Sequence, residues 1–360
     1  MSDELKKHRE AVIPGDGIGP EVTAEAVRAL KAAARAGGFG LEFDEYPWGC
    51  GYYHRTDRMM PADGLGILSG YDAILLGAVG DPSVPDHISL GGLLLEIRKG
   101  FDQYVNLRPV KLLAGAPCPL KGKESRDIDM VFVRENTEGE YSGKGEWKNA
   151  RLPDETVIQY GIFTRRGCER VMRYAYELAR STGKKLTSVS KGNALNYSMV
   201  FWDKTFAEVG RDYPDVKTDM LLVDAAGMFM IRDPSRFGVV VTSNLFGDIL
   251  TDIGAAIAGG MGLAAGANID PERRYPSMFE PIHGSAPDIA GKGTADPLAA
   301  IWSASMMLDH LGETAAAKAV LGAVETVLAE GRVLTPDLGG SASTKDVGTE
   351  VERIIGGKNG

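Results

Sequence analysis

The chain has 360 residues, which is enough for two domains or for one large α/β unit. Hydrophobic residues make up 44% of it and charged residues 25%, an ordinary balance for a soluble globular protein. The net charge of −9 argues against a general nucleic-acid binder, and it means that an anionic substrate needs a local cluster of basic residues.

The cysteine content and the N-terminal residues indicate the cellular compartment in which the protein works. The three cysteines are few and odd in number, which favours a reducing compartment over a disulfide framework. The first ten residues are charged and lack the apolar segment of a signal peptide. No apolar run approaches the ~20 residues of a membrane-spanning helix. We therefore expect a cytoplasmic protein with no membrane or nucleic-acid partner.

The N-terminal region has the pattern of a strand, a glycine-rich turn and a helix. A short strand at 11–14 runs into the sequence GDGIG at 15–19, and an amphipathic helix follows over 22–34. Such a turn suggests nucleotide binding, but Pro20 stands where the dinucleotide fingerprint requires a glycine. We therefore predict a tight turn here and no Rossmann fold of the usual kind.

Strand and helix patterns alternate along the rest of the chain. Runs with strand character recur at 41–48, 73–76, 130–133, 186–190, 220–223 and 239–242. Helical patterns cover 166–180, 197–209, 297–311, 313–330 and 345–355. This alternation predicts an α/β fold with a largely parallel sheet flanked by helices. The polar stretch 142–159 has few core residues and reads as an excursion or arm.

Three arginines lie at or near the ends of predicted elements: Arg98, Arg108 and Arg134. A guanidinium fork suits a bidentate grip on carboxylates, so these residues are candidates for binding an acidic substrate. The alternative is three surface arginines with acidic neighbours, which is the commoner situation for any one of them alone.

A pair of aspartates provides the most informative local signal. Asp248 and Asp252 lie four residues apart in the sequence SNLFGDILTD at 243–252, where Ser243 or Asn244 can cap a helix. On a helix both carboxylates share one face, and their repulsion calls for a compensating cation. A solvated acidic face is the alternative interpretation.

Two further residues follow predicted strands. Asp224 comes after the strand 220–223 and would complete an oxygen-ligand set for Mg²⁺ or Mn²⁺. Lys191 comes after the strand 186–190 and is either a general base or an ion-pair partner.

Six motifs, in this order, resemble the β-decarboxylating dehydrogenase family, which includes isocitrate, 3-isopropylmalate and tartrate/D-malate dehydrogenases. They are PGDGIGPE at 14–21, IRKGFDQYVNLRP at 97–109, RENTEGEYSG at 134–143, SKGNALN at 190–196, SNLFGDILTD at 243–252 and EPIHGSAPDIAGKGTADP at 280–297. The resemblance implies an isopropylmalate dehydrogenase-like two-domain fold with a non-Rossmann nucleotide site.

The resemblance also implies that the two domains have different roles. Residues 1–100 and 255–360 would form a large nucleotide-binding domain, and 101–254 a small dimerisation and substrate domain with an arm near 142–159. A homodimer with shared active sites is implied, in which Asp224 and Lys191 of one subunit complete the site that holds Asp248 and Asp252 of the other.

Site residues carry over from the matching motifs as expectations. The arginines at 98, 108 and 134 would bind substrate carboxylates, with Ser89 and Leu90 beside them. The aspartates at 224, 248 and 252 would hold the metal, Lys191 would take the hydroxyl proton, and Tyr141 would protonate the enol that remains after CO₂ leaves. The cofactor would contact Asn193, His283, Gly284, Ser285, Ala286, Asp288 and Asp296.

Cofactor choice and substrate branch follow from the same resemblance. A carboxylate at Asp288 favours NAD over NADP, because it accepts a hydrogen bond from a 2′-hydroxyl and repels a 2′-phosphate. The sequence VPDHISL at 84–90 is most similar to the tartrate/D-malate branch, which also implies K⁺ as a further cation. Leu90, Leu93 and Leu94 offer instead the apolar contacts of a 3-isopropylmalate pocket.

Two positions depart from the family pattern. Gly91 stands where the tartrate branch has a tryptophan, and Asp296 stands where the family has an asparagine that touches adenine. Asp296 then serves either the adenine or only the start of the helix at Pro297.

The leading expectation is therefore NAD- and metal-dependent oxidative decarboxylation of D-malate, giving pyruvate and CO₂, or of tartrate. The alternative within the family is 3-isopropylmalate dehydrogenase. A metal-dependent phosphate-ester hydrolase would use the aspartates and arginines but leave Asp288 idle. A non-catalytic binding subunit would not need Lys191 and Tyr141.

Overall fold

The computed structural model describes residues 6–357 and divides into two compact units. Unit 1 comprises Met1–Gln103, Leu112–Ser125 and Ala255–Gly360, and unit 2 comprises Tyr104–Lys111 and Arg126–Gly254. These ranges differ from the expected domains by residues 101–103 and 112–125, which belong to unit 1. The nucleotide-binding and dimerisation roles that we expect of the two domains stay predictions.

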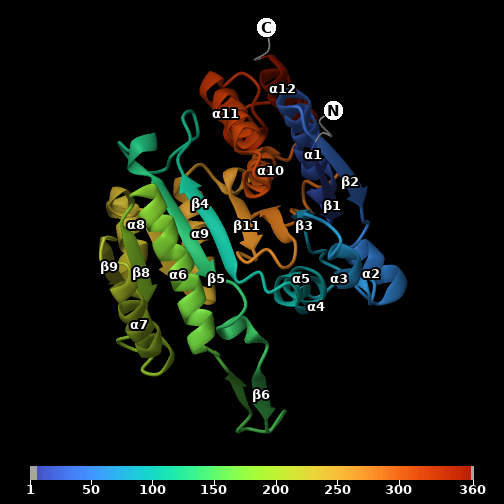
Figure 1. Cartoon of the computed structure of the whole chain (residues 1–360). Coiled ribbons are helices and arrows are strands. Elements are labelled where there is room, and N and C mark those ends of the chain that lie inside the picture. Colours follow the sequence, from blue (N-terminus) through green and yellow to red (C-terminus); the bar gives the residue numbers. More distant parts are fainter. Residues whose placement is uncertain (1–5, 358–360) are drawn as a thin grey trace. The chain divides into compact units, whose positions relative to one another are not determined.

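Unit 1 begins with alternating strands and helices and ends with three helices (Figure 1). Its strands are β1 Lys7–Gly15, β2 Gly40–Glu45, β3 Ala73–Ala78, β11 Ala265–Ile269 and β12 Ser277–Pro281. Its helices are α1 Gly19–Gly37, α2 Cys50–Thr56, α3 Gly64–Leu68, α4 Asp86–Gly92, α5 Leu94–Gly100, α10 Leu298–His310, α11 Thr314–Glu330 and α12 Thr344–Gly356.

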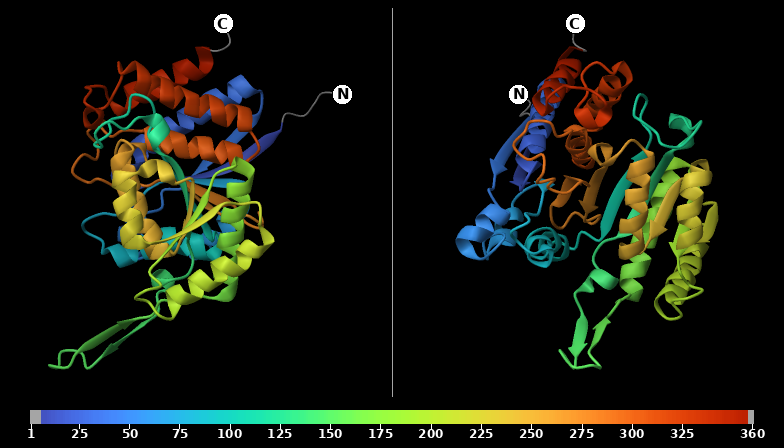
Figure 2. Two further views of the ribbon diagram at one scale, coloured as in Figure 1. Left: turned by 90° about the vertical axis from the view of Figure 1, so that its left-hand side faces the viewer. Right: turned by 180° about the vertical axis from the view of Figure 1, so that it is seen from behind.

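The strands of unit 1 lie in the order β2-β1-β3-β12-β11. The pairs β2–β1, β1–β3 and β3–β12 are parallel, whereas β11 and β12 are antiparallel. Helices α1, α10, α11 and α12 pack together over one face (Figure 2). The other face buries Ala11, Ile13 and Ile74 against the short helices α2 to α5. The expected α/β fold with a mostly parallel sheet is confirmed.

Helix boundaries in both units follow from local capping. Helix α1 has Pro20 in its first turn and is followed by Gly38, which caps its C-terminus with a φ of 73°, the left-handed conformation that glycine adopts easily. Helix α6, Arg165–Thr182, begins after Thr164, whose hydroxyl accepts a 3.0 Å hydrogen bond from the amide of Gly167. These ends lie within a few residues of the predicted ones.

Unit 2 contains a second mostly parallel set of strands in the order β4-β5-β10-β8-β9. These are β4 Val105–Lys111, β5 Asp129–Glu135, β8 Leu186–Ser190, β9 Thr218–Leu222 and β10 Val239–Thr242. Its other helices are α7 Ser198–Val209, α8 Val223–Arg232 and most of α9 Asn244–Ile257. Only the β4–β5 pair is antiparallel among the pairs of these five strands.

The predicted arm is a β-hairpin. Strands β6 Gly145–Lys148 and β7 Thr156–Gln159 pair only with each other among the described strands and project from the rest of unit 2 (Figures 1 and 2). One local prediction was wrong: strand β9 ends at Leu222, and Asp224 lies in the first turn of helix α8, which the sequence reading missed.

None of the helices between residues 6 and 357 has both the length and the apolar character that a bilayer crossing requires.

Candidate active site

Two buried arginines come from neighbouring antiparallel strands of unit 2. Arg134 on β5 lies opposite Asn106 on β4, and Arg108 follows two residues later, so all three side chains share one face of the sheet. Arg108 is 6% exposed and Arg134 is 1% exposed, so the surface-arginine interpretation is wrong for both. Arg108 also lies in the middle of its strand rather than at an end.

Helix α9 runs over these arginines and supplies their partners. The Asn244 side-chain oxygen accepts hydrogen bonds from Nε and Nη2 of Arg134 at 3.0 and 2.7 Å. The Thr251 hydroxyl accepts one from Nη1 of Arg108 at 2.6 Å. Asp248 Oδ1 accepts from Nη1 of Arg134 and lies 3.5 Å from Nη2 of Arg108. The helix therefore presents an acidic and amide face to two fixed guanidinium groups.

A glycine permits this close approach. A Cβ atom on Gly247 would lie 2.6 Å from Cγ and 2.8 Å from Cβ of Arg134. No larger residue fits at this point of α9 without a shift of the helix or of Arg134.

The charges of the site act on each other. Burial alone would raise the pKa of Asp248, but the charges of Arg134 and Arg108 outweigh it and hold that pKa below its usual range. Burial, with the Asp248 charge as a further contribution, raises the pKa of Asp252. Burial and the same charge also raise the pKa of Tyr141, whose hydroxyl donates a 2.9 Å hydrogen bond to Asp248 Oδ2. Asp248 is thus ionised, while Tyr141 keeps its proton.

A second pair of charged residues lies elsewhere in unit 2. Lys191 follows β8, Asp224 follows β9, and these parallel strands are neighbours in register, with Ser190 opposite Leu222. The Lys191 Nζ atom lies 2.6 Å from Asp224 Oδ1, and this hydrogen bond is the largest cause of the lowered pKa of Asp224. Asn193 is exposed in the turn after Lys191.

The three expected metal ligands do not form one group within the chain. Between residues 6 and 357 the structure contains no group of three or more His, Cys, Asp or Glu side chains placed to hold a metal ion. Asp248 and Asp252 share a face of α9, whereas Asp224 pairs with Lys191.

Unit 1 places two glycine-containing loops against each other. The Asp16 carboxylate accepts hydrogen bonds from the amides of Cys50 at 2.8 Å and Gly80 at 3.0 Å, which ties the GDGIG turn to the end of β3. The amide of Ile18 donates a 2.8 Å bond to the carbonyl of Ser285, and a Cβ on Gly17 would lie 1.9 Å from that oxygen. The turn at 15–19 therefore supports the loop after β12.

That loop holds the expected cofactor residues. Gly284 and Asp288 are exposed, Ser285 is buried, and Ala286 has the unusual φ of 40°. The His283 ring contacts the Gly284 carbonyl through Nδ1, while its Nε2 is buried and has no hydrogen-bond partner within the described residues. Burial lowers the pKa of His283. This orphaned nitrogen marks a place for a polar ligand atom.

Asp296 lies two residues before the first residue of helix α10. Its Oδ1 accepts a 2.9 Å bond from the amide of Leu298, as expected of a residue at a helix start, and its Oδ2 is buried without a hydrogen-bond partner among the described residues. Burial, with the Asp337 charge as a further contribution, raises the pKa of Asp296 well above its usual range.

The remaining substrate candidates lie in α4, in α5 and at Leu93 between them, all in unit 1. Arg98 is 5% exposed and donates a 2.6 Å bond to Glu280, which also accepts one from Asn268 at 2.8 Å. Leu90 is exposed, while Ser89 is buried. Leu93 is fully buried in the core of unit 1, so its contribution to an apolar substrate pocket stays a prediction.

Four polar residues of these sites were missed at the level of sequence: Asn106, Asn244, Thr251 and Glu280. Asn244 and Thr251 lie within the SNLFGDILTD motif, at i−4 and i+3 of Asp248, so helical spacing would have placed them on its face. Asn106 accepts a 2.7 Å hydrogen bond from Nε of Arg108, two residues along β4, so strand periodicity would have placed it beside that arginine. No local signal indicates Glu280, because its partner Arg98 lies on a helix far away in the sequence.

Comparison with known proteins identifies the class to which this fold and site belong. The sequence signature described as isocitrate/isopropylmalate dehydrogenase matches residues 10–351. The chain therefore belongs to the isocitrate/isopropylmalate dehydrogenase family and is one of its decarboxylating dehydrogenases.

Individual relatives show which members of the family this chain is similar to. The chain is 51% identical to the D-malate dehydrogenase (decarboxylating) of Escherichia coli over 359 residues, covering 98% of this chain and 99% of that protein. It is 50% identical to the tartrate dehydrogenase/decarboxylase of Pseudomonas putida over 356 residues, covering 96% and 97%. The crystal structure of isocitrate dehydrogenase from Methylococcus capsulatus is 35% identical and superposes with a TM-score of 0.88 over 97% of this chain and 99% of that one.

Proposed function

We propose that this protein catalyses the NAD- and divalent-metal-dependent oxidative decarboxylation of a small 2-hydroxy dicarboxylic acid, D-malate or tartrate. The observation that carries the proposal is the group formed by Arg108, Arg134, Tyr141 and Asp248. It combines two buried guanidinium groups with an ionised carboxylate and a protonated phenol. The identity of about half of all residues with a D-malate and a tartrate dehydrogenase supports the same reaction.

The substrate's carboxylates would bind to the arginines. Asn244, Thr251 and Asn106 hold the guanidinium groups of Arg134 and Arg108 in place through hydrogen bonds. A guanidinium that is already oriented loses little freedom when a carboxylate binds. Arg98, held by Glu280, is the third candidate for this role.

The residues of α9 fit a divalent cation. Asp248 and Asp252 offer carboxylate oxygens on one helix face, which is the ligand type that Mg²⁺ and Mn²⁺ prefer. Burial and the nearby Asp248 charge raise the pKa of Asp252. A bound cation would lower that pKa again, because it stabilises the ionised carboxylate. Asp224 of a second subunit would add a third oxygen ligand.

The loop after β12 fits a dinucleotide. His283 Nε2 is a buried nitrogen without a partner among the described residues, and Asp288 offers an exposed carboxylate to a ribose 2′-hydroxyl. Asp296 Oδ2 is buried without a hydrogen-bond partner among the described residues, and it would meet the adenine where the family uses an asparagine amide. NAD rather than NADP follows from Asp288.

The chain's own residues supply the proton transfers. NAD would accept the hydride and the divalent cation would act as a Lewis acid at the substrate's ketone oxygen. Lys191 Nζ would take the proton of the substrate hydroxyl. The Tyr141 hydroxyl, which keeps its proton because its pKa is raised, would protonate the carbon that loses CO₂. Asn193 would contact the nicotinamide.

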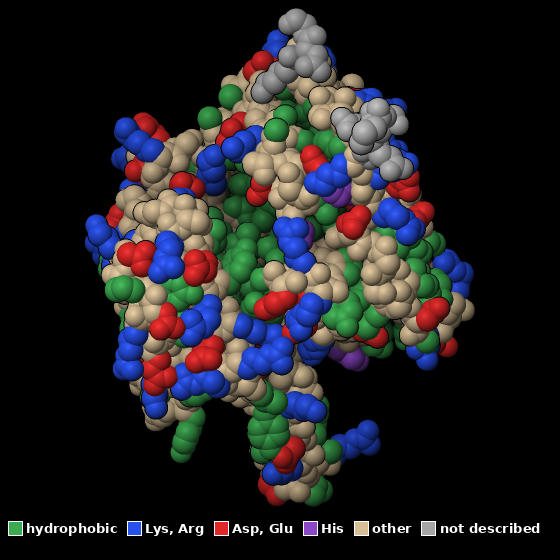
Figure 3. Space-filling view, viewed as in Figure 1, with side chains coloured by type: hydrophobic (Ala, Val, Ile, Leu, Met, Phe, Trp, Pro, Cys, Tyr) green, Lys and Arg blue, Asp and Glu red, His purple; other side chains and the backbone are tan. Residues whose placement is uncertain are grey.

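A second copy of this chain would complete the site. Unit 2 exposes large apolar side chains on the hairpin and on helices α7 to α9: Trp147, Leu152, Val157, Tyr197, Val200, Met228, Ile231 and Ile249. Tyr197 is 92% exposed and Trp147 is 68% exposed. Figure 3 shows hydrophobic side chains on the surface of the projecting hairpin. Apolar surface of this extent is typical of protein interfaces, and a homodimer would bury it.

The substrate preference is tested by NADH formation with NAD, Mn²⁺ and K⁺ in parallel assays with D-malate, L-tartrate and 3-isopropylmalate. We expect turnover of D-malate or tartrate and little of 3-isopropylmalate, because Gly91 adds no apolar surface. A preference for 3-isopropylmalate would place the chain in the leucine-biosynthetic branch. No NADH from any of the three would refute the proposal and favour a hydrolase or a binding protein.

A further inference from the structure

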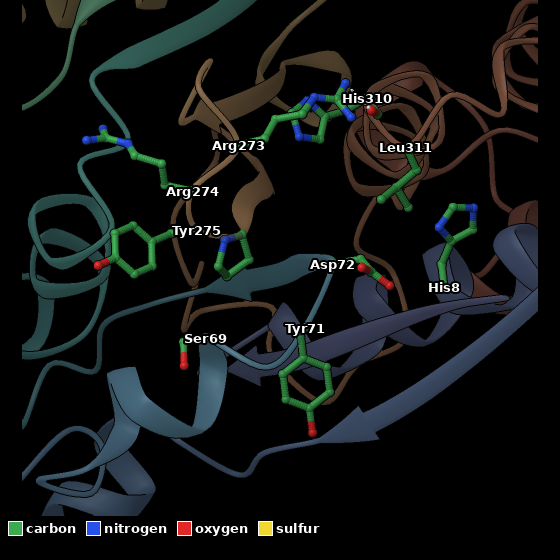
Figure 4. A pocket seen from close by; sticks show the side chains of 10 residues that line it. His8, Ser69, Tyr71, Asp72, Arg273, Arg274, Tyr275, His310 and Leu311 are labelled. Atoms are coloured by element: carbon green, nitrogen blue, oxygen red, sulfur yellow. Dashed lines mark hydrogen bonds between the residues drawn. The ribbon is translucent and has the colours of Figure 1, made fainter.

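A polar pocket lies in unit 1, at the edge of the sheet where its parallel strands begin. Its volume is about 330 Å³. Among the residues that line it are His8, Asp72, Arg273, Arg274, Pro276 and His310 (Figure 4).

The pocket is separate from the cofactor loops. His8 lies near the start of β1, Asp72 directly precedes β3, and Pro276 directly precedes β12. The loops at 15–19 and 282–288 follow the opposite ends of β1 and β12. A six-residue strand such as β3 spans about 20 Å, so the pocket and the cofactor loops lie at opposite edges of one sheet.

Arg273 is the cation of the pocket that has no acidic partner. Its guanidinium donates a 2.6 Å hydrogen bond to the carbonyl of His310, and within residues 6–357 it makes no ion pair (Figure 4). Arg274, by contrast, is paired with Asp102, Asp270 and Glu272. The His310 ring is half-buried, and its pKa of about 4 leaves it neutral, so it does not compete for an anion as a charge.

The turn that carries Arg273 is rigid. The Asp270 carboxylate accepts hydrogen bonds from the amides of Glu272, Arg274 and Tyr275, and Arg273 is held at a φ of 54°. The Tyr275 ring stacks on Phe101 with ring centres 5.3 Å apart. A fixed turn presents the free donors of Arg273 without a large loss of entropy on binding.

Asp72 determines which anions suit the pocket. Its Oδ2 accepts a 2.8 Å bond from the amide of Arg9, and within the described part of the chain no cation pairs with it. The nearby Glu10 carboxyl is buried, and its pKa of about 8 keeps it neutral, so Asp72 is the acidic group of the pocket. The Asp72 carboxylate would repel a dianion such as phosphate. A monocarboxylate that also carries an N–H or O–H donor could pair its carboxylate with Arg273 and donate a hydrogen bond to Asp72.

We propose that this pocket binds a small amino or hydroxy monocarboxylate, with its carboxylate on Arg273 and its donor group on Asp72. The ligand class follows from two groups that line the same small cavity. The guanidinium of Arg273 has no ion-pair partner among the described residues, and the carboxylate of Asp72 can accept a hydrogen bond. The site is independent of the proposed dehydrogenase reaction.

Isothermal titration of the full-length protein with L-serine tests the proposal, with acetate and inorganic phosphate as comparison probes. We expect serine to bind more tightly than either, because only serine pairs with both residues. Arg273→Gln should weaken serine binding about tenfold or more, since a charge-assisted hydrogen bond is lost. Arg332→Gln is the matched control, because Arg332 is an exposed arginine paired only with Glu330 among the described residues, and it should leave binding unchanged.

Asp72→Asn provides a second, independent variant. It should weaken serine but strengthen acetate and phosphate, because the repulsion of anions is removed. NADH formation with D-malate should be unchanged in all three variants, which checks that each is folded. Equal serine affinities of the Arg273→Gln and Arg332→Gln variants would overturn the proposal, as would phosphate binding more tightly than serine to the wild-type protein or no binding of serine at all.

Discussion

Replacing Gly247 by alanine would test whether the close approach of α9 to Arg134 sets the active site. The new Cβ would lie 2.6, 2.8 and 3.0 Å from the Cγ, Cβ and Cδ atoms of Arg134. These are the inner atoms of a side chain that is 1% exposed and held by Asn244 and Asp248, so they cannot move aside cheaply. Either the helix or the guanidinium must shift by several tenths of an ångström.

Two opposing contributions give the expected change in stability. Alanine favours a helix interior over glycine by ~1 kcal/mol, whereas forcing an extra methyl group into a packed contact costs about 1–3 kcal/mol. The free energy of unfolding should therefore fall by roughly 0–2 kcal/mol. Misplacing a substrate-binding group by about 1 Å reduces kcat/KM by about 10²-fold, so activity should fall more clearly than stability.

Gly66 in α3 provides the matched control, because a Cβ there would meet no atom within 4 Å. Gly66→Ala should keep wild-type kcat/KM and gain up to ~1 kcal/mol of stability. The assays are urea unfolding and NADH formation with D-malate for both variants. A Gly247→Ala protein that is as stable and as active as Gly66→Ala would refute the argument.

Three further predictions follow from the same structure. Lys191→Met should abolish turnover yet keep NAD binding, measured by fluorescence titration; surviving activity would exclude Lys191 as the base. Co-refolding Lys191→Met with the inactive Asp252→Asn should restore about a quarter of wild-type activity, because half of the dimers are hybrids with one intact site; no recovery would contradict shared sites. Glu10 keeps its proton up to pH of about 8 when folded but loses it near 4.5 when unfolded, so its contribution to stability falls between these values, by up to ~1.4 kcal/mol per pH unit. Glu10→Gln should flatten this slope in urea melts from pH 5 to 8, and an unchanged slope would show that Glu10 is not its source.

Local sequence pattern predicted most helices and strands, because hydrophobic periodicity and capping residues lie within each element or next to it. The strand 186–190 and the helices near 166–180 and 345–355 carry clear periodicity and capping residues, and the structure has β8, α6 and α12 there. The missed helix α8 shows the limit of this reasoning. Its sequence VDAAGMFMIR has a glycine in its middle and follows a strand without a turn residue, so nothing marks the boundary at Val223.

Candidate site residues were found where a motif is continuous in sequence. Asp248 and Asp252 lie four apart on α9, and that spacing alone places both carboxylates on one face. Positions at or near the ends of predicted elements indicated Lys191 and the arginines as candidates, and the resemblance assigned their roles and added Tyr141. It did not supply Asn244, Thr251 or Glu280, whose importance depends on which side chains they hold in place.

The sequence by itself determined the types of the elements, the family of the chain and the pairing of two aspartates on one helix face, because each of these depends on residues close together along the chain. Only the tertiary structure decided that Arg98, Arg108 and Arg134 are buried rather than exposed, that Asp224 pairs with Lys191, and that Arg273 and Asp72 line a common pocket. Burial and pairing of charges depend on strand order and helix packing between distant segments, and single-sequence periodicity contains no information about them.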